Sequence, residues 1–189
     1  MHQINWGIIG SGSIANAFSY SIQAATNSKL TSIFGRNPKK VDAFADKFHI
    51  DAHHQLDDFI SSEEIDAIYV ATPHSEHFFY ALEAIKNGKH VLCEKPFTMN
   101  AYESMILLDL ANAKNIFLME AFMYRTHPQT RNILDNLHFL SDAKSKIMIE
   151  ASFGFKADVL ATHRLRNPEL GGGAILDVGC YPLTMAKLI

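Results

Sequence analysis

Short apolar segments alternate with amphipathic segments from Ile4 to Glu120, and this alternation narrows the folds that the chain can adopt. Strands are expected at Ile4–Gly10, Leu30–Phe34, Ala67–Ala71, His90–Cys93 and Ile116–Glu120. The helices between them are expected to begin at Ile14, Pro38, Asp57, Ser75 and Ala101. Strands that alternate with helices in this way predict a parallel sheet with helices on both faces. The sequence therefore predicts an α/β domain of the doubly wound Rossmann type.

Residues at the expected helix ends support this assignment. Ser13 is predicted to cap the first helix, and Asn37 to cap a helix whose first residue is Pro38. Gly88 is predicted to close the helix Ser75–Asn87. The stretch His49–Asp57 is expected to be a connection without regular structure, followed by a short helix.

The pattern changes after residue 123. We expect a helix at Pro128–Leu137, a strand at Lys144–Phe155, a polar loop at Lys156–Leu170 and a helix at Ala174–Ile189. One strand and one helix cannot bury each other's apolar faces adequately. We therefore expect residues 1–123 to form one domain and residues 124–189 to form the beginning of a second, open-sheet α/β domain that is incomplete in this chain.

The composition excludes several classes of protein. The 189 residues are 48% hydrophobic and 20% charged, and the net charge of -3 gives no attraction to nucleic acid or an anionic membrane. No apolar run approaches the roughly 18 residues that a membrane-spanning helix needs. The N-terminus lacks a basic segment followed by an apolar one, so we expect no signal peptide. Two cysteines, Cys93 and Cys180, are too few for a disulfide framework, which favours reduced thiols and a cytoplasmic protein.

A glycine-rich turn follows the first expected strand. Residues Gly10–Ala15 read G-x-G-x-x-A, in which the first glycine permits a tight turn and the second lets a pyrophosphate approach the backbone. Ala15 allows the helix to pack closely on the strand, and the amides at the helix start can bind phosphate. In this βαβ context the pattern predicts a dinucleotide site. The residues expected to contact the cofactor here are Gly10, Ser11, Gly12, Ser13 and Ile14.

The end of the second expected strand indicates which dinucleotide is bound. An NAD site usually places an acidic residue about 20 residues beyond the fingerprint, to bind the ribose hydroxyls. This chain has no Asp or Glu before Asp42, and it places Arg36 after the strand, with Lys39 and Lys40 close by. A guanidinium can hold a 2′-phosphate with two hydrogen bonds. NADP is therefore favoured over NAD, although a purely solvated Arg36 remains an alternative.

The segment Val91–Asn100 runs from an apolar strand into Glu94, Lys95 and Pro96. In an open α/β sheet, ligands bind at the carboxyl edge of the strands, which is where this turn is expected to place Lys95. A lysine in a partly desolvated cleft gives up some of its preference for the ammonium form, which suits it to proton transfer. The alternative is a surface lysine at a strand end.

Histidines gather in two places without making a metal site. His74 and His77 flank Glu76 after the expected strand Ala67–Ala71, and three further histidines lie at positions 49, 53 and 54. Neither set has an additional carboxylate or cysteine at a recognisable ligand spacing. We therefore predict no metal ion.

A third group of polar residues lies in the segment Gly171–Pro182. If this segment is helical, Asp177 and Tyr181 are four residues apart and share a face. A phenol and a carboxylate opposite Lys95 would form a proton-transfer group, because a nearby ammonium makes the phenol a better proton donor. A core aromatic and a carboxylate at a helix start are the alternative.

Taken together, five stretches resemble the glucose–fructose oxidoreductase and inositol dehydrogenase family (Gfo/Idh/MocA). They are Gly10–Ala15, Thr72–His77, Glu94–Pro96, Glu120–Arg125 and Gly171–Pro182, in family order. The resemblance implies a Rossmann domain for NADP and a second α/β domain for substrate and oligomerisation. It also implies that Lys95 is catalytic and that its peptide bond to proline is cis. Further cofactor contacts are implied for Thr72, Pro73, His74, His77, Glu94 and Lys95.

Tyr181 indicates a branch within that family. Many sugar and inositol dehydrogenases of the family carry histidine where this chain has Tyr181, and the tyrosine form resembles the branch with dihydrodiol dehydrogenase and NADP-dependent xylose dehydrogenase. The resemblance implies hydride transfer at a secondary carbon of a sugar, polyol or diol, with Lys95, Tyr181 and Asp177 as catalytic residues, in a homo-oligomer. A competing interpretation is a dinucleotide-binding or sensing module without a working substrate site.

Overall fold

The computed structural model describes residues 3–137 and 148–189. These residues fall into two compact units, one ending at Glu120 and the other beginning at Ala121. Each unit is described by itself. No helix in the described ranges is both long and apolar enough to cross a bilayer.

The first unit is built on a six-stranded sheet with the order β3-β2-β1-β4-β5-β6. The strands are β1 (Ile4–Ile9), β2 (Ser28–Phe34), β3 (Asp51–His53), β4 (Ala67–Val70), β5 (His90–Glu94) and β6 (Leu118–Ala121). The pairs β1–β2, β1–β4, β2–β3 and β4–β5 are all parallel. From β1 the strands are added first toward one edge of the sheet, as β2 and β3, and then toward the other edge, as β4, β5 and β6. The carboxyl ends of β1 and β4 therefore flank the switch point where such sheets bind ligands. The predicted Rossmann fold is confirmed.

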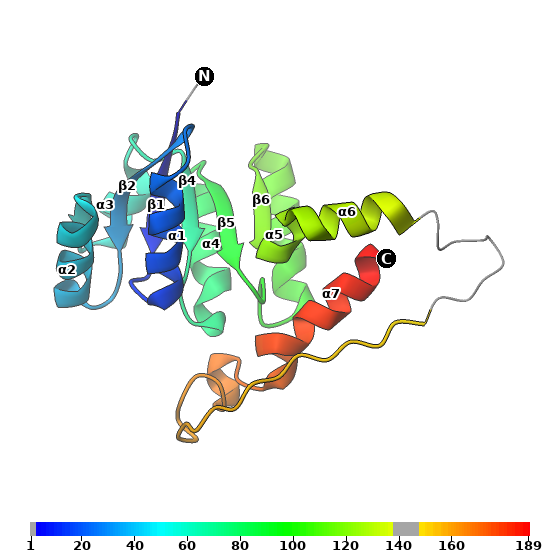
Figure 1. Ribbon diagram of the computed structural model, residues 1–189. Coiled ribbons are helices and arrows are strands. Elements are labelled where there is room, and N and C mark those ends of the chain that lie inside the picture. Colours follow the sequence, from blue (N-terminus) through cyan, green and yellow to red (C-terminus); the bar gives the residue numbers. More distant parts are fainter. Residues whose placement is uncertain (1–2, 138–147) are drawn as a thin grey trace. The chain divides into compact units, whose positions relative to one another are not determined.

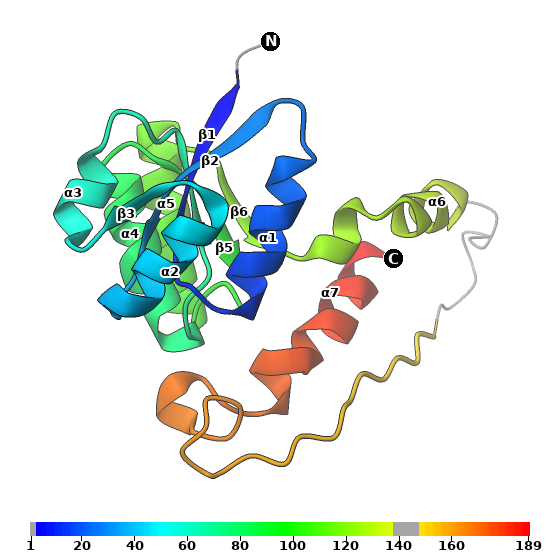
Figure 2. The ribbon, with the colours of Figure 1, turned by 60° about the vertical axis from the view of Figure 1, so that its left-hand side comes forward.

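Helices cover this sheet on both faces, as Figures 1 and 2 show. They are α1 (Ser13–Gln23), α2 (Pro38–Phe48), α3 (Leu56–Ser61), α4 (His77–Lys86) and α5 (Ala101–Lys114). The helices α1 and α2 lie on one face, and the apolar sides of α3, α4 and α5 share a core with the sheet on the other. Its central side chains are fully buried, among them Phe59, Ile68, Ile85 and Leu107. A fully buried side chain of this size stabilises the fold by about 1.5–3 kcal/mol.

Two of the local predictions for this unit are wrong. The stretch His49–Asp57, which was expected to be a connection, contains β3, and the residues of β3 pair with Ser32–Phe34 of β2. Its three residues are largely exposed and show no apolar alternation, so pairing with β2 makes them a strand. The helix α1 begins at Ser13 with Gly12 as its N-cap, so Ser13 does not cap it.

The caps predicted for the next helices are confirmed. The side chain of Asn37 accepts a hydrogen bond from the backbone N–H of Lys40 and so caps α2. Gly88 follows α4 with a φ of 76°, a left-handed conformation that favours glycine.

The second unit is mainly helical. It contains a short 3₁₀ turn at Met123–Thr126, α6 (Pro128–Asn136), a 3₁₀ turn at Pro168–Leu170, a π-helical segment at Ile175–Gly179 and α7 (Cys180–Leu188). Of the strand predicted at Lys144–Phe155, residues 144–147 lie outside the described residues, and residues 148–155 form no strand. A strand needs a hydrogen-bonded neighbour. Among the described residues of this unit, only Ala121 at the end of β6 belongs to a strand.

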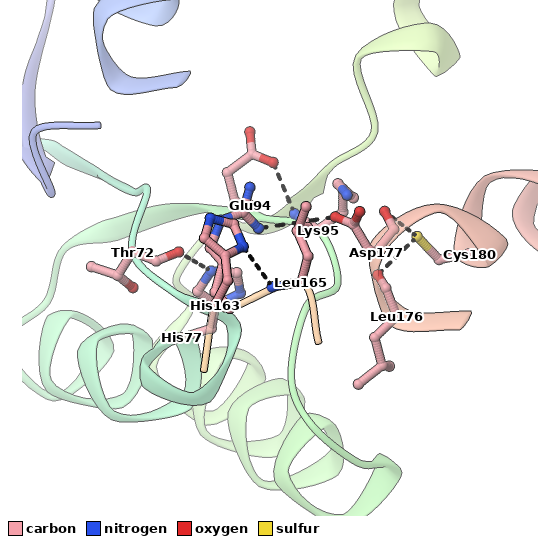
Figure 3. A network of polar contacts seen from close by, with 10 residues as sticks. Thr72, His77, Glu94, Lys95, His163, Leu165, Leu176, Asp177 and Cys180 are labelled. Carbon is pink, nitrogen blue, oxygen red and sulfur yellow. Dashed lines mark hydrogen bonds and ion pairs between the residues drawn. The ribbon is translucent and has the colours of Figure 1, made fainter. Parts of the chain in front are cut away.

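The helix predicted at Ala174–Ile189 is present, but its first turn is a π-helix. Pro182 explains this, since it has no N–H to donate to the carbonyl of Val178 and its ring would clash with that carbonyl. The thiol of Cys180 donates to the carbonyl oxygens of Leu176, at 3.4 Å, and Asp177, at 3.9 Å (Figure 3). The wide turn is therefore held partly by a side chain.

Candidate functional site

The loop between β1 and α1 contains two glycines with different requirements. Gly10 has a φ of 109°, and a Cβ there would lie 2.5 Å from the carbonyl oxygen of Ala71. Gly12 has an ordinary φ of -77°, and a Cβ there would meet nothing within 4 Å. The fold therefore requires glycine at position 10, whereas no neighbour in the described structure requires it at position 12. The open space lies at the N-terminus of α1.

The first turn of α1 suits an anion. In the described structure no side chain caps this turn, and it contains no acidic residue. The amides of an uncapped helix N-terminus, together with the helix dipole, bind phosphate groups. Ala15 is fully buried, so the helix packs closely on the sheet, as the fingerprint predicts. The open space beside Gly12 leaves this turn accessible to an anion.

Arg36 lies just after β2 and pairs with an acid that the sequence analysis did not include in the site. Its Nη1 is 2.5 Å from Oε1 of Glu76, which lies in the 3₁₀ turn His74–Glu76 after β4. The Arg36 side chain is 68% exposed and that of Glu76 is 21% exposed. Oε2 of Glu76 is buried and has no hydrogen-bond partner in the part of the chain that the structure describes. Burial raises the pKa of Glu76, and the Arg36 guanidinium opposes that rise.

The turn carrying Lys95 is held at three successive backbone groups. The backbone N–H of Lys95 donates to Oε2 of Glu94 at 3.2 Å. The carbonyl oxygen of Pro96 lies 2.8 Å from Nδ1 of His77, and the backbone N–H of Phe97 donates to Oε1 of Glu120 at 2.8 Å. The Lys95–Pro96 peptide bond is cis, as the resemblance implies. Lys95 is half-buried at the carboxyl end of β5.

Glu94 is part of a second pair between neighbouring strands. The hydroxyl of Tyr69, on β4, donates to Oε1 of Glu94 at 2.5 Å. Burial raises the pKa of Glu94, whereas the Tyr69 hydroxyl and the neighbouring Lys95 act to lower it. Both carboxylate oxygens of Glu94 are thus engaged within the protein.

His77 lies at the start of α4 and is fully buried. Its Nε2 is 3.0 Å from the carbonyl oxygen of Thr72, a contact that Figure 3 shows. Burial lowers the pKa of His77, while its contacts with the Pro96 and Thr72 carbonyls act to raise it. Because both ring nitrogens face backbone carbonyls, His77 connects the loops that follow β4 and β5.

The remaining residues expected to contact the cofactor lie after β4. His74 is buried, and its ring centroid is 5.8 Å from that of His77. Oγ1 of Thr72 is buried and has no hydrogen-bond partner among the described residues. An unpartnered buried hydroxyl beside the switch point is a candidate contact for a ligand. Pro73 precedes the 3₁₀ turn as its N-cap residue.

Asp177 and Tyr181 lie in the second unit, on consecutive helical segments. Asp177 is buried, and its Oδ1 is 4.0 Å from Nη1 of Arg164, a partner that the sequence spacing did not suggest. The ring of Tyr181 packs against Phe122 and Phe153, with centroids 5.4 Å and 5.3 Å away. The phenol is therefore held by aromatic neighbours within its own unit.

No metal site emerges from residues 3–137 and 148–189, where no group of three or more His, Cys, Asp or Glu side chains could hold an ion. A cavity of about 570 Å³ lies in the first unit. It is lined mainly by apolar residues near the amino ends of four strands, namely Ile4, Trp6, Asp66, Ala67, His90, Val91, Leu92, Phe117 and Met119. This end of the sheet is opposite the glycine loop, so the cavity is not the dinucleotide site.

Residues 4–122 match the family model described as "Oxidoreductase family, NAD-binding Rossmann fold", named for Gfo, Idh and MocA. The chain is 34% identical to the trans-1,2-dihydrobenzene-1,2-diol dehydrogenase of Xenopus tropicalis over 97% of this chain and 56% of that protein. It is 32% identical to the D-xylose 1-dehydrogenase (NADP(+)) of Hypocrea jecorina, over 97% of this chain and 52% of that protein. The chain thus spans little more than half the length of these relatives.

A solved structure agrees with these matches. The structure is that of KijD10, a 3-ketoreductase from Actinomadura kijaniata, in complex with NADP and TDP-benzene. It superposes on 99% of this chain and 57% of its own, with a TM-score of 0.85 and 29% sequence identity.

Proposed function

The chain belongs to the Gfo/Idh/MocA family of oxidoreductases, and from this premise we propose that it binds NADP and acts on a CH–OH group of a sugar, polyol or diol. The observation that carries the proposal is the loop between β1 and α1. There Gly12 leaves open space beside a helix N-terminus that no described side chain caps. Phosphate binding explains a glycine that the fold itself does not require.

The choice of NADP rests on Arg36 and on the relatives. The guanidinium is largely exposed at the carboxyl end of β2, where an NAD site usually carries an acid on that strand. The Hypocrea jecorina relative is named for NADP(+), and the KijD10 structure holds NADP. In this proposal Arg36 binds the 2′-phosphate, and the α1 amides with Gly10, Ser11, Gly12, Ser13 and Ile14 bind the pyrophosphate.

The proposal keeps the two domains expected from the sequence, with residues 1–123 for the cofactor and residues 124–189 for the substrate. When bound, the nicotinamide supplies or accepts the hydride. Lys95 holds the substrate oxygen by its ammonium group, and Tyr181 exchanges the hydroxyl proton. Asp177 orients the groups around it through its carboxylate. These three roles rest on the family resemblance and on the position of Lys95 at the carboxyl edge of the sheet.

A homo-oligomer is part of the proposal. Several large apolar side chains of the second unit are exposed, including Met148, Leu160, Ile175 and Leu183. We expect an oligomer interface to cover these side chains. Sedimentation at increasing protein concentration tests this part, and a monomer at every concentration would contradict it.

Two measurements test the proposed function. Titration with NADPH, followed by nicotinamide fluorescence, should show saturable binding to the purified chain. A panel of aldoses, polyols and diols with NADP should then identify turnover by the appearance of NADPH. Binding with turnover supports the proposal, and binding without turnover would favour a dinucleotide-binding module. The absence of NADPH binding would contradict both.

A further inference from the structure

We infer that Glu76 is a specificity-determining residue, whose carboxylate opposes the 2′-phosphate of NADP at Arg36 and thereby limits the preference for NADP over NAD. The inference rests on the proposed function, because it takes Arg36 to meet the adenosine ribose. It adds a residue from the turn after β4 to a site that the sequence assigned to the end of β2.

The geometry brings two chain segments together on one guanidinium. Arg36 follows β2 and Glu76 follows β4, the two neighbours of β1 in the sheet. The 2.5 Å separation of Nη1 from Oε1 places the two charges in direct contact as an ion pair. Glu76 therefore lies where its charge acts on any anion that Arg36 binds.

The environment of Glu76 strengthens the effect of that charge. Its side chain is mostly buried, and its Oε2 has no hydrogen-bond partner within the described ranges. A charge that is poorly hydrated acts over a longer distance than one in bulk water.

Arg36 can bind Glu76 and a phosphate at the same time. A guanidinium carries five N–H donors, and the contact with the carboxylate is made at Nη1 of a side chain that is 68% exposed. The exposed remainder can bind a phosphate, which carries a charge of about −1.5 to −2 at neutral pH. The two anions would then share one cation and repel each other. NAD presents hydroxyl groups in place of the phosphate, so the repulsion acts on NADP alone.

Glu76 also holds the Arg36 side chain in place, and this positioning favours the binding of NADP. The variant Glu76→Gln separates the positioning from the charge repulsion, because a side-chain amide oxygen can still accept the Arg36 hydrogen bond but carries no charge. Glu76→Asp keeps the charge with a shorter side chain. Glu83→Gln is the matched control, since Glu83 lies on α4 and forms an ion pair with Lys86 at 2.8 Å.

The experiment measures the dissociation constants of NADPH and NADH by nicotinamide fluorescence for the wild-type chain and these three variants. Glu76→Gln should tighten NADPH binding about tenfold, which is about 1.4 kcal/mol, and change NADH binding less than about twofold. Glu76→Asp and Glu83→Gln should stay near wild type for both cofactors. The gain in Glu76→Gln should shrink as salt is added, because Arg36 is largely exposed.

Several outcomes would overturn the inference. Unchanged or weaker NADPH binding by Glu76→Gln, with normal wild-type binding, would overturn it and leave the proposed function intact. An equal gain in Glu76→Asp would assign the effect to side-chain shape, which also overturns it. A wild-type chain that binds neither cofactor would overturn the proposed function and the inference together. Circular dichroism of each variant verifies that the fold is retained.

Discussion

The buried imidazole of His77 links α4 to the turn that carries Lys95, because its Nδ1 lies 2.8 Å from the carbonyl oxygen of Pro96. The other ring nitrogen faces the carbonyl oxygen of Thr72 at 3.0 Å. A carbonyl only accepts hydrogen bonds, and a neutral imidazole has one N–H, so the neutral ring donates to one of the two loops. Only the protonated ring donates to both.

We expect His77 to make stability depend on pH. Burial lowers its pKa in the folded chain below the ordinary value of 6.5. As the pH falls below that value, the unfolded chain therefore binds the proton first. The stability contributed by neutral His77 is complete above the unfolded pKa and is lost as the pH falls toward the folded pKa.

Urea unfolding at about pH 7.5 and about pH 5.5 measures this effect. Burial raises the pKa of Glu94, which makes its contribution grow as the pH falls, so the informative quantity is the difference between wild type and His77→Gln. The loss of stability at the lower pH should be smaller in His77→Gln. An equal loss in both proteins would assign the pH dependence to other groups.

The two glycines of the β1–α1 loop should respond differently to alanine. Gly10→Ala forces a side chain into a left-handed conformation 2.5 Å from Ala71 O, so it should destabilise the first unit by about 1–3 kcal/mol. Gly12→Ala meets nothing within 4 Å and should change stability by less than about 0.5 kcal/mol. Because its methyl group would occupy the space assigned to the pyrophosphate, it should nevertheless weaken NADPH binding.

Thermal unfolding and NADPH titration of the two variants check this contrast. A Gly12→Ala chain that is as stable as wild type and binds NADPH equally well would remove the main support for the phosphate site.

Arg36→Ala should weaken NADPH binding far more than NADH binding, because only NADPH has a 2′-phosphate to lose its partner. A charge-assisted contact of this kind contributes roughly 1.5–3 kcal/mol. Fluorescence titration with both cofactors measures the difference. Lys29→Met, at the amino end of the sheet, is a control for the loss of one positive charge. Equal weakening of both cofactors would mean that Arg36 acts on the adenine or on the fold.

The sequence allowed the sheet to be predicted wherever a strand carries its own apolar run. All of β4, the second half of β1 and alternate residues of β5 are buried, so their apolar side chains alone mark these strands. β3 could not be predicted in this way, because its three residues become a strand by pairing with β2. The strand predicted at Lys144–Phe155 is absent from residues 148–155 for a related reason, since an apolar run needs a partner to become a strand.

The backbone turns of the candidate site could be predicted from the sequence, whereas the pairing of its side chains could not. The glycine loop can be recognised in the sequence because the positive φ and the lack of space at position 10 require glycine there. The pairs Arg36–Glu76 and Asp177–Arg164 join residues far apart in sequence, and no local spacing indicates them. The contacts of His77 could not be predicted from local spacing either. The motif suggested His77 as a cofactor contact, whereas its ring nitrogens face two backbone carbonyls.

Lys95→Met should abolish most turnover while leaving NADPH binding in place. The substitution removes the ammonium group proposed to hold the substrate oxygen, and a group of this kind contributes about 100-fold or more to the rate. The backbone contacts of the turn at Glu94, Pro96 and Phe97 do not involve the Lys95 side chain, so the fold should persist. Steady-state kinetics on a substrate identified from the panel, together with NADPH titration, separates the two effects. Turnover close to wild type in a folded Lys95→Met chain would refute the assignment of Lys95 as a catalytic residue.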